Sequence, residues 1–160
     1  MAREPVMTIL RQPSPELRAR LNERLTVFNR RIVGRSEARR LGIVLADPVS
    51  GREIAGLAAE SYWGWMFVDQ LWVSGRHRRR GLGTRLMDAA EAEARRRRCR
   101  GIWLDTWSWQ ARGFYEKRGF RVFGTIDDFP TPHARHFLMK RLDGSRTRRG
   151  ITPPDAIPPD

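Results

Sequence analysis

The sequence has almost no cysteine and no long hydrophobic run. Cys99 is the only cysteine among 160 residues, so an internal disulfide is excluded. No stretch approaches the roughly 18 apolar residues that a membrane span needs, and the opening residues, MAREPVMTIL, lack the apolar core of a secretory signal. These absences argue against a disulfide-stapled secreted scaffold and against a membrane protein. They predict a soluble protein of the reducing cytoplasm.

Acidic residues are also scarce relative to basic ones. The chain has 18 Asp and Glu against 31 Lys and Arg, which gives a formal net charge of +13. This excess suits nucleic acid, an anionic membrane surface or an acidic ligand, and composition alone does not choose among them. Ten arginines and only three acidic residues lie between positions 75 and 100, so the positive charge is concentrated in this segment.

The length and the 40% hydrophobic content suit one domain with a single core. The last segment, 143–160, is rich in Pro, Gly and charge, which predicts a disordered tail. One domain is therefore predicted over residues 1–142.

Hydrophobic periodicity and turn residues predict the order of helices and strands. The expected helices cover residues 13–31, 82–98 and 110–118, and the expected strands cover 41–47, 53–62, 66–73, 101–107, 120–126 and 136–142. Ser14 is the expected N-cap of the first helix, with Pro15 at its first position. In the second helix, Glu91–Arg95 and Glu93–Arg97 are expected ion pairs at helical spacing, and the arginines at 95–98 are expected to be solvated at the negative end of the dipole. The order predicts an α+β or mixed α/β fold that contains an antiparallel meander. Ligands in such sheets tend to bind where neighbouring strands part.

A basic turn, RHRRRGLGT at residues 76–84, joins a predicted strand to a predicted helix. Gly81 and Gly83 lack the Cβ atoms that would keep backbone N–H groups away from a phosphate, and the helix dipole adds partial positive charge. No Gly-Lys-Ser/Thr follows, and Leu86 stands where a dinucleotide-binding motif has its third glycine. The turn predicts a site for one diphosphate. An ordinary connection with surface arginines is the alternative.

Two segments together resemble the GNAT superfamily of acyl-CoA-dependent N-acyltransferases. Residues 78–83, RRRGLG, are similar to its Arg/Gln-x-x-Gly-x-Gly/Ala signature. Residues 108–120, SWQARGFYEKRGF, are similar to its block Asn-x-x-Ala-x-x-Phe/Leu-Tyr-x-x-x-Gly-Phe, with Ser108 in place of the usual Asn. The resemblance covers residues 41–142. It implies a central mixed, mostly antiparallel sheet of six to seven strands, splayed at the middle, with helices on both faces.

The resemblance also implies acetyl-CoA as co-substrate, without a metal. Backbone N–H groups of about residues 79–84 would hold the pyrophosphate, and the strand ending at Val73 would pair with the pantetheine arm. Basic side chains, Arg76 among them, would add attraction for the phosphates. The residues implied to bind the cofactor are Leu71, Trp72, Val73, Arg78, Arg79, Arg80, Gly81, Leu82, Gly83, Thr84, Ser108, Ala111, Phe114 and Lys117.

Transfer of an acetyl group to an amine needs an acid for the departing thiolate and a base for the amine. The resemblance implies that Tyr115 donates a proton or hydrogen bond to the sulfur, and a phenol with a pKa of about 10 is protonated at neutral pH. Asp69 is the expected base, because a carboxylate is unusual in an apolar strand. Strand alternation predicts that Asp69 shares a face with Phe67, Leu71 and Val73.

Other residues have weaker claims to the site. Glu60 is the second candidate base, and the resemblance implies that a main-chain N–H near Leu71 or Trp72 meets the oxyanion. Cys99 could carry an acyl group, but it lies about 24 Å along the helix from the glycine turn, which favours direct attack in a ternary complex. His133 and His136 alone make a poor metal site.

The acceptor could be a small molecule or a protein amine. Trp107 and Trp109 are candidate lining for its site, because they lead into the segment that carries Tyr115. Two other functions stay open at this stage, a basic nucleic-acid-binding module and a non-catalytic acyl-CoA-binding domain. Sheet edges in small α/β domains often pair, which allows a homodimer.

Overall fold

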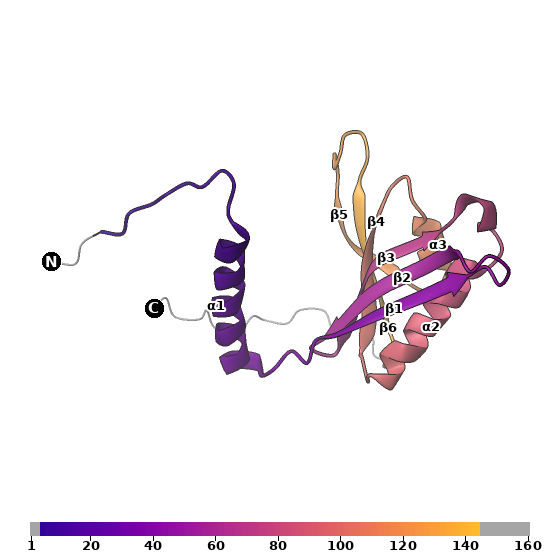
Figure 1. Ribbon diagram of the computed structural model, residues 1–160, viewed down its shortest axis with the longest axis horizontal. Coiled ribbons are helices and arrows are strands. Elements are labelled where there is room, and N and C mark those ends of the chain that lie inside the picture. Colours follow the sequence, from indigo (N-terminus) through magenta and orange to yellow (C-terminus); the bar gives the residue numbers. More distant parts are fainter. Residues whose placement is uncertain (1–3, 145–160) are drawn as a thin grey trace. The chain divides into compact units, whose positions relative to one another are not determined.

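The structure, a computed structural model, describes residues 4–144 (Figure 1). The chain divides into two compact units with a boundary between Ser36 and Glu37. The helices are α1 (Pro15–Val33), α2 (Leu82–Arg96), α3 (Arg112–Lys117) and the 3₁₀ turn η1 (Gly75–His77). The strands are β1 (Arg39–Ala46), β2 (Glu53–Tyr62), β3 (Trp65–Val73), β4 (Gly101–Trp107), β5 (Arg121–Ile126) and β6 (Arg135–Arg141). The predicted tail lies outside the described residues from position 145 onward.

The first unit contains α1, whose ends follow from local sequence. Ser14 Oγ accepts a hydrogen bond from the Leu17 N–H at 3.3 Å, and Pro15 begins the helix, so the predicted N-cap is confirmed. Gly34 has a φ of 78° and ends the helix two residues beyond the predicted limit. No helix within residues 4–144 is both long enough and apolar enough to cross a membrane.

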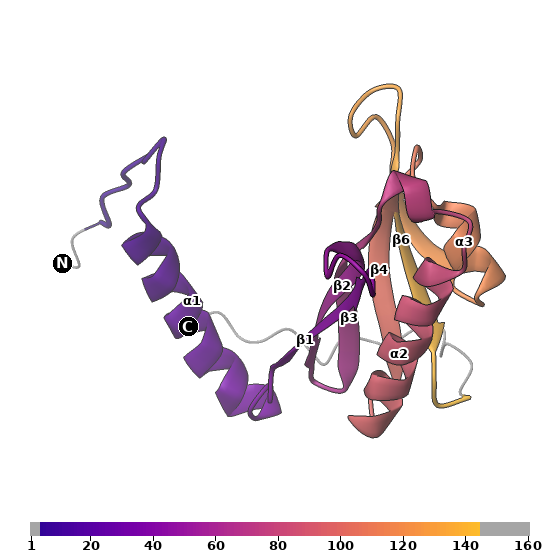
Figure 2. The ribbon, with the colours of Figure 1, turned by 45° about the vertical axis from the view of Figure 1, so that its right-hand side comes forward.

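The second unit is built on one six-stranded sheet with the order β1-β2-β3-β4-β6-β5. Among the described strands, β3 and β4 pair in parallel and all other neighbours pair antiparallel. The predicted mixed, mostly antiparallel sheet is therefore confirmed. Helices α2 and α3 lie together against one face of the sheet (Figure 2). The expectation that a helix covers the opposite face stays a prediction.

One hydrophobic core lies between the sheet and its two helices. The buried side of α2 consists of Leu86, Met87, Ala90 and Ala94, all inaccessible to solvent. Alternate residues of four strands complete the core, and the largest fully buried strand side chains are Met66, Ile102, Leu104 and Leu138.

Charged side chains tie α3 and β6 to α2. Glu91 accepts hydrogen bonds from Arg118 Nη2 at 3.0 Å and from Lys140 Nζ at 2.7 Å. The helical spacing predicted a Glu91–Arg95 pair, and that prediction is wrong because Glu91 faces these two partners. Arg95 instead donates to the carbonyl oxygen of Leu142 at 2.9 Å.

A second tie joins the end of α2 to the start of β1. Arg97 donates to Glu93 at 2.6 Å, as the sequence predicted, and its side chain is only 9% exposed. The same guanidinium donates to the carbonyl oxygens of Arg39 and Arg40 and to Ser61 Oγ. The buried Arg97 side chain therefore joins the end of α2 to β1 and β2, whereas the sequence suggested a solvated charge at the helix end.

Gly101 begins β4 at a place with no room for a side chain. A Cβ there would lie 2.5 Å from Trp65 Cζ3 and 2.8 Å from the Lys140 carbonyl oxygen. We expect Gly101→Ala to lower the free energy of unfolding by about 2 kcal/mol through overpacking. Thermal unfolding measures the loss. Gly113→Ala is the control, because a Cβ at that exposed helical position meets nothing within 4 Å and should leave stability unchanged or raise it.

Candidate active site

The turn between β3 and α2 leaves backbone donors exposed at the start of a helix. Arg79 and Gly81 adopt left-handed conformations, with φ of 62° and 75°, and Gly81 is the N-cap. Arg85 N–H donates to the Gly81 carbonyl oxygen at 3.0 Å. The N–H groups of residues 82–84 have no partner within the described part of the chain. With the helix dipole, these N–H groups form a site for an anion.

Three segments that the sequence assigned to the cofactor meet at Gly83. A Cβ on Gly83 would lie 3.5 Å from Phe114 Cζ and 4.0 Å from Val73 Cγ2. The end of β3, the first turn of α2 and the start of α3 are therefore in contact. Leu82 is half-buried beside them and Thr84 is exposed.

The arginines of the turn lie mostly in solvent. Arg79 and Arg80 are exposed, as is Arg76 in η1. Arg78 is exposed too, but its Nε donates to the Val73 carbonyl oxygen at 3.3 Å, which links the turn to the end of β3. Their expected attraction for phosphate stays a prediction.

The second motif contributes exposed residues around α3. Ser108 Oγ lies 3.1 Å from His133 Nδ1 and accepts a hydrogen bond from the Ala134 N–H at 3.3 Å. This hydroxyl therefore holds the loop between β5 and β6, a structural contact that the sequence did not predict. Ala111 precedes α3 and Lys117 ends it, both exposed. Cofactor contacts from Ser108, Ala111 and Lys117 stay predictions.

Strands β3 and β4 diverge where the predicted base lies (Figure 1). Their parallel pairing ends at Val68 and Leu104, although β3 continues to Val73. Asp69 is the first residue past this point. It is also the extra residue of a β-bulge, because the pairing of β3 with β2 passes from Val68 directly to Gln70. Beyond Val68 the edge of β3 that faces β4 has no strand partner among the described residues.

The bulge exchanges the two faces of β3. Val68 lies in the core before the bulge, and Leu71 and Val73 pack against the same core after it. The prediction that Asp69 shares a face with Leu71 and Val73 is therefore wrong, because uninterrupted alternation does not hold across a bulge. Asp69 does share its surroundings with Phe67, as predicted.

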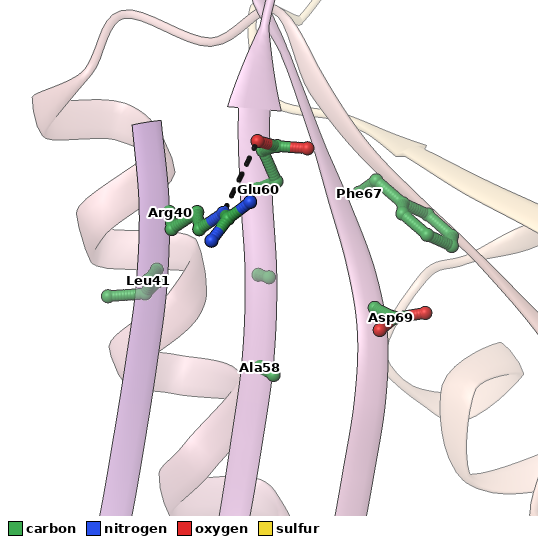
Figure 3. Close-up of a pocket in the computed structure, with 7 residues that line it drawn as sticks. Arg40, Leu41, Ala58, Glu60, Phe67 and Asp69 are labelled. Carbon is green, nitrogen blue, oxygen red and sulfur yellow. Dashed lines mark ion pairs between the residues drawn. The ribbon is translucent and has the colours of Figure 1, made fainter. Parts of the chain in front are cut away.

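Asp69 and Phe67 line a hollow of about 270 Å³ on the sheet (Figure 3). The lining residues are Arg40, Leu41, Ala58, Ala59, Glu60, Phe67 and Asp69. The hollow therefore contains both candidate bases, from neighbouring strands. Glu60 Oε1 is 4.0 Å from Arg40 Nε, a long ion pair with an exposed arginine. Phe67 stacks on Trp103 with ring centroids 4.1 Å apart, which places an aromatic surface beside the carboxylates.

Tyr115 lies in α3 and is held by the end of its own helix. Gly119 has a φ of 86°, and the N–H groups of Gly119 and Phe120 donate to the carbonyl oxygens of Glu116 and Tyr115. This is a Schellman motif, and it packs the Phe120 ring edge-on against the Tyr115 ring. The tyrosine is therefore only 7% exposed and fixed in place.

The Tyr115 hydroxyl is available for chemistry. It makes no hydrogen bond within residues 4–144. Within that range, Arg118 Nε is the only fully buried side-chain nitrogen or oxygen that lacks a hydrogen-bond partner. The Tyr115 oxygen also lacks a partner, so it is not fully buried and reaches solvent. Burial of the ring, and then the nearby Asp105 carboxylate, raise the pKa of Tyr115 above its usual value of 10.0. The phenol therefore stays protonated at neutral pH.

The cysteine and histidines have other surroundings. Cys99 is buried, and burial raises the pKa of its thiol, so it is a poor nucleophile. His136 Nδ1 lies 3.0 Å from Thr125 Oγ1, inside the sheet. Residues 4–144 contain no group of three or more His, Cys, Asp or Glu that could hold a metal ion.

An aromatic cluster at the end of β4 is larger than the sequence indicated. Trp107 and Trp109 stack with centroids 5.0 Å apart and an interplanar angle of 13°. Phe129 meets Trp107 edge-on at 4.9 Å, and the Arg135 guanidinium lies 5.1 Å from the Trp107 ring. Trp107, Trp109, Phe129 and Arg135 are called the aromatic bracket below. The sequence contained no signal for Phe129 or Arg135, because the β5–β6 loop brings Phe129 to Trp107, and Arg135 lies opposite Trp107 through the pairing of β6 with β4.

Comparison with known proteins places this arrangement in a family. The family model described as acetyltransferase (GNAT) family matches residues 4–120. A blasticidin-S acetyltransferase from Streptomyces morookaense is 42% identical over 93 residues, which cover 58% of this chain and 68% of that protein. Acetyltransferase Atu2258 from Agrobacterium fabrum is 30% identical over 122 residues, covering 76% and 88%. The crystal structure of an acetyltransferase from Bacillus cereus has a TM-score of 0.78 at 28% identity, covering 84% and 98%.

The chain belongs to the GNAT family of acetyltransferases. It is an acyl-CoA-dependent N-acetyltransferase, and acetyl-CoA is its co-substrate. The free N–H groups of residues 82–84 and the unpaired edge of β3 fit a diphosphate and a peptide-like arm. The nucleic-acid-binding and non-catalytic alternatives are therefore not retained.

Proposed function

We propose that this enzyme acetylates the primary amine of a small molecule by direct attack in a ternary complex. The observation that carries the proposal is the position of Asp69, at the bulge where β3 leaves β4. Bulges beside an opening in a sheet commonly re-aim a functional side chain. The hollow beside Asp69 is the proposed acceptor site.

Acetyl-CoA supplies the acetyl group as a reactive thioester. N–H groups of residues 82–84 hold its diphosphate, and the free edge of β3 hydrogen-bonds its arm. A main-chain N–H near Leu71 or Trp72 on that edge stabilises the oxyanion. The amine nitrogen bonds to the carbonyl carbon as the carbon–sulfur bond breaks. Asp69 accepts the amine proton, directly or through water, and Tyr115 donates its proton to the sulfur.

The surroundings of the hollow favour a cationic acceptor. Glu60 and Asp69 both contribute carboxylates, and Phe67 offers an aromatic face, so an alkylammonium group finds charge and cation–π partners there. The blasticidin-S acetyltransferase named above acts on a small molecule, which supports a small acceptor over a protein. A homodimer stays a prediction.

Replacing Asp69 tests the assignment of the base. We expect Asp69→Asn to lower kcat/KM about tenfold, with the loss limited because Glu60 and solvent still accept protons. The Kd for acetyl-CoA should change less than twofold. Release of free thiol measures turnover, and calorimetry measures affinity. If Glu60→Gln gives the larger loss and Asp69→Asn none, Glu60 is the base.

The function itself is tested by ligand stabilisation and turnover. Acetyl-CoA at 100 times its Kd should add about 2.7 kcal/mol to the free energy of unfolding. Primary amines should then release thiol from acetyl-CoA, while matched tertiary amines should not. Stabilisation by oligonucleotides but not by acetyl-CoA would contradict the proposal, as would thiol release that is independent of the amine.

A further inference from the structure

The aromatic bracket has more exposed ring surface than packing explains. Trp109 is 51% exposed and Phe129 is 42% exposed, and neither belongs to the hydrophobic core. Both rings contact Trp107, one by stacking and one edge-on. Exposed aromatic surface on a small protein commonly marks a place where something binds.

The bracket is built from two distant segments and is held in place. Ser108 Oγ contacts His133 Nδ1 and accepts from the Ala134 N–H, which fastens the loop beside Trp109. The His133 ring meets Trp109 edge-on at 4.7 Å. Gln110 Oε1 accepts from the Trp107 N–H at 3.1 Å and so fixes the turn that follows β4. The rings are therefore preorganised.

The guanidinium of Arg135 limits which chemical groups the aromatic bracket can bind. Its Nε donates to Asp105 Oδ2 at 2.7 Å, and its guanidinium lies 5.1 to 5.8 Å from the rings of Trp107, Phe129 and Phe137. The guanidinium already occupies the cation–π position at these rings and the Asp105 carboxylate is already paired with it, so a second cation there would meet repulsion from Arg135 without a free carboxylate to offset it. A neutral flat ring stacks there without this repulsion.

The bracket lies at the end of β4, which pairs with the strand of Asp69 and leads into the helix of Tyr115. Trp107 ends β4, the strand that parts from β3 at Asp69, and α3 with Tyr115 begins five residues after Trp107. We propose that the aromatic bracket is the second half of the acceptor site and binds a flat, neutral aromatic ring joined to the amine by a flexible arm. The ammonium end then goes to the carboxylates of the hollow. This inference rests on the proposed function.

Matched amines test the ring requirement. 2-Phenylethylamine and 2-cyclohexylethylamine have the same carbon skeleton and differ in ring flatness. We expect the wild-type kcat/KM to be about tenfold higher for the aromatic amine, mainly through KM, as stacking at an exposed tryptophan would give. In Trp109→Ala the ratio should fall to about one, because kcat/KM for the aromatic amine should drop more than kcat/KM for the cyclohexyl amine, and Trp109→Phe should restore part of it.

Trp63→Ala is the control, because Trp63 is similarly exposed, at 46%, in the hairpin between β2 and β3. It should keep the tenfold ratio. Equal turnover of both amines by the wild type, or an unchanged ratio in Trp109→Ala at an unchanged thermal midpoint, overturns the bracket and leaves the proposed function standing. No thiol release with any primary amine, although acetyl-CoA binds, overturns the proposed function and this inference with it.

Discussion

Tyr115→Phe is expected to lower kcat about 100-fold while the Kd for acetyl-CoA changes less than twofold. Loss of a general acid commonly costs two or more orders of magnitude. The phenylalanine ring fills the same buried space. The lost hydroxyl has no hydrogen-bond partner within residues 4–144, so the fold loses no contact there. Single-turnover thiol release measures the chemical step, and calorimetry measures the affinity.

The pH profile separates an acid from a merely structural tyrosine. Because burial and Asp105 raise the pKa of Tyr115, its protonated form persists past pH 10. Wild-type kcat should therefore fall with rising pH only above that point, and the fall should be absent in Tyr115→Phe. A variant that keeps wild-type turnover would remove the acid role.

Gly81→Asp is expected to weaken acetyl-CoA binding about 30-fold, or about 2 kcal/mol. Gly81 is the N-cap of α2, directly before the free N–H groups of residues 82–84. A carboxylate there repels the diphosphate and competes for the same donors. A Cβ at this position meets nothing within 4 Å, so the loss does not come from a clash. Calorimetric titration gives the Kd.

Gly81→Asn is the matched control for that variant. Asparagine has nearly the same shape and also tolerates the left-handed conformation that Gly81 adopts, with φ of 75°. We expect it to weaken binding only about threefold, through backbone strain. The gap between the two variants should narrow as salt rises, because screening weakens charge repulsion. Equal losses in both variants would place the diphosphate elsewhere.

Most of the fold could be predicted from local sequence. Apolar spacing, turn residues, Ser14 and Pro15 predicted the order of elements and most of their limits, because caps and periodicity are local. Pairings between charged side chains were harder to predict from the sequence. Glu91 and Arg97 each have a helical neighbour of opposite charge, yet Glu91 binds partners from distant elements instead and Arg97 binds such partners in addition, which local spacing cannot reveal.

The candidate site shows the same difference between features set by local sequence and features set by long-range contacts. The glycines and Tyr115 lie in contiguous motifs, and the structure brings the segments of these motifs into contact at Gly83, while their contacts with the cofactor stay predictions. The bulge at Asp69 has no signature in the apolar run around it, so the faces of Leu71 and Val73 were assigned wrongly. Phe129 reaches Trp107 through the β5–β6 loop and Arg135 through the pairing of β6 with β4, and both follow from long-range contacts.

The loop from residue 127 to 134 is joined to the end of β4 by one main-chain hydrogen bond, from the Ser108 N–H to the Ala134 carbonyl oxygen, and otherwise by side chains, whereas the proposed donor site relies on main-chain groups. Substitution of a side chain leaves the main-chain N–H and C=O groups in place, but it removes the contacts that the side chain's ring makes. Random libraries confined to this loop should therefore yield catalysts with altered acceptor choice and intact thioester handling, which makes the segment a natural place for retargeting by directed evolution.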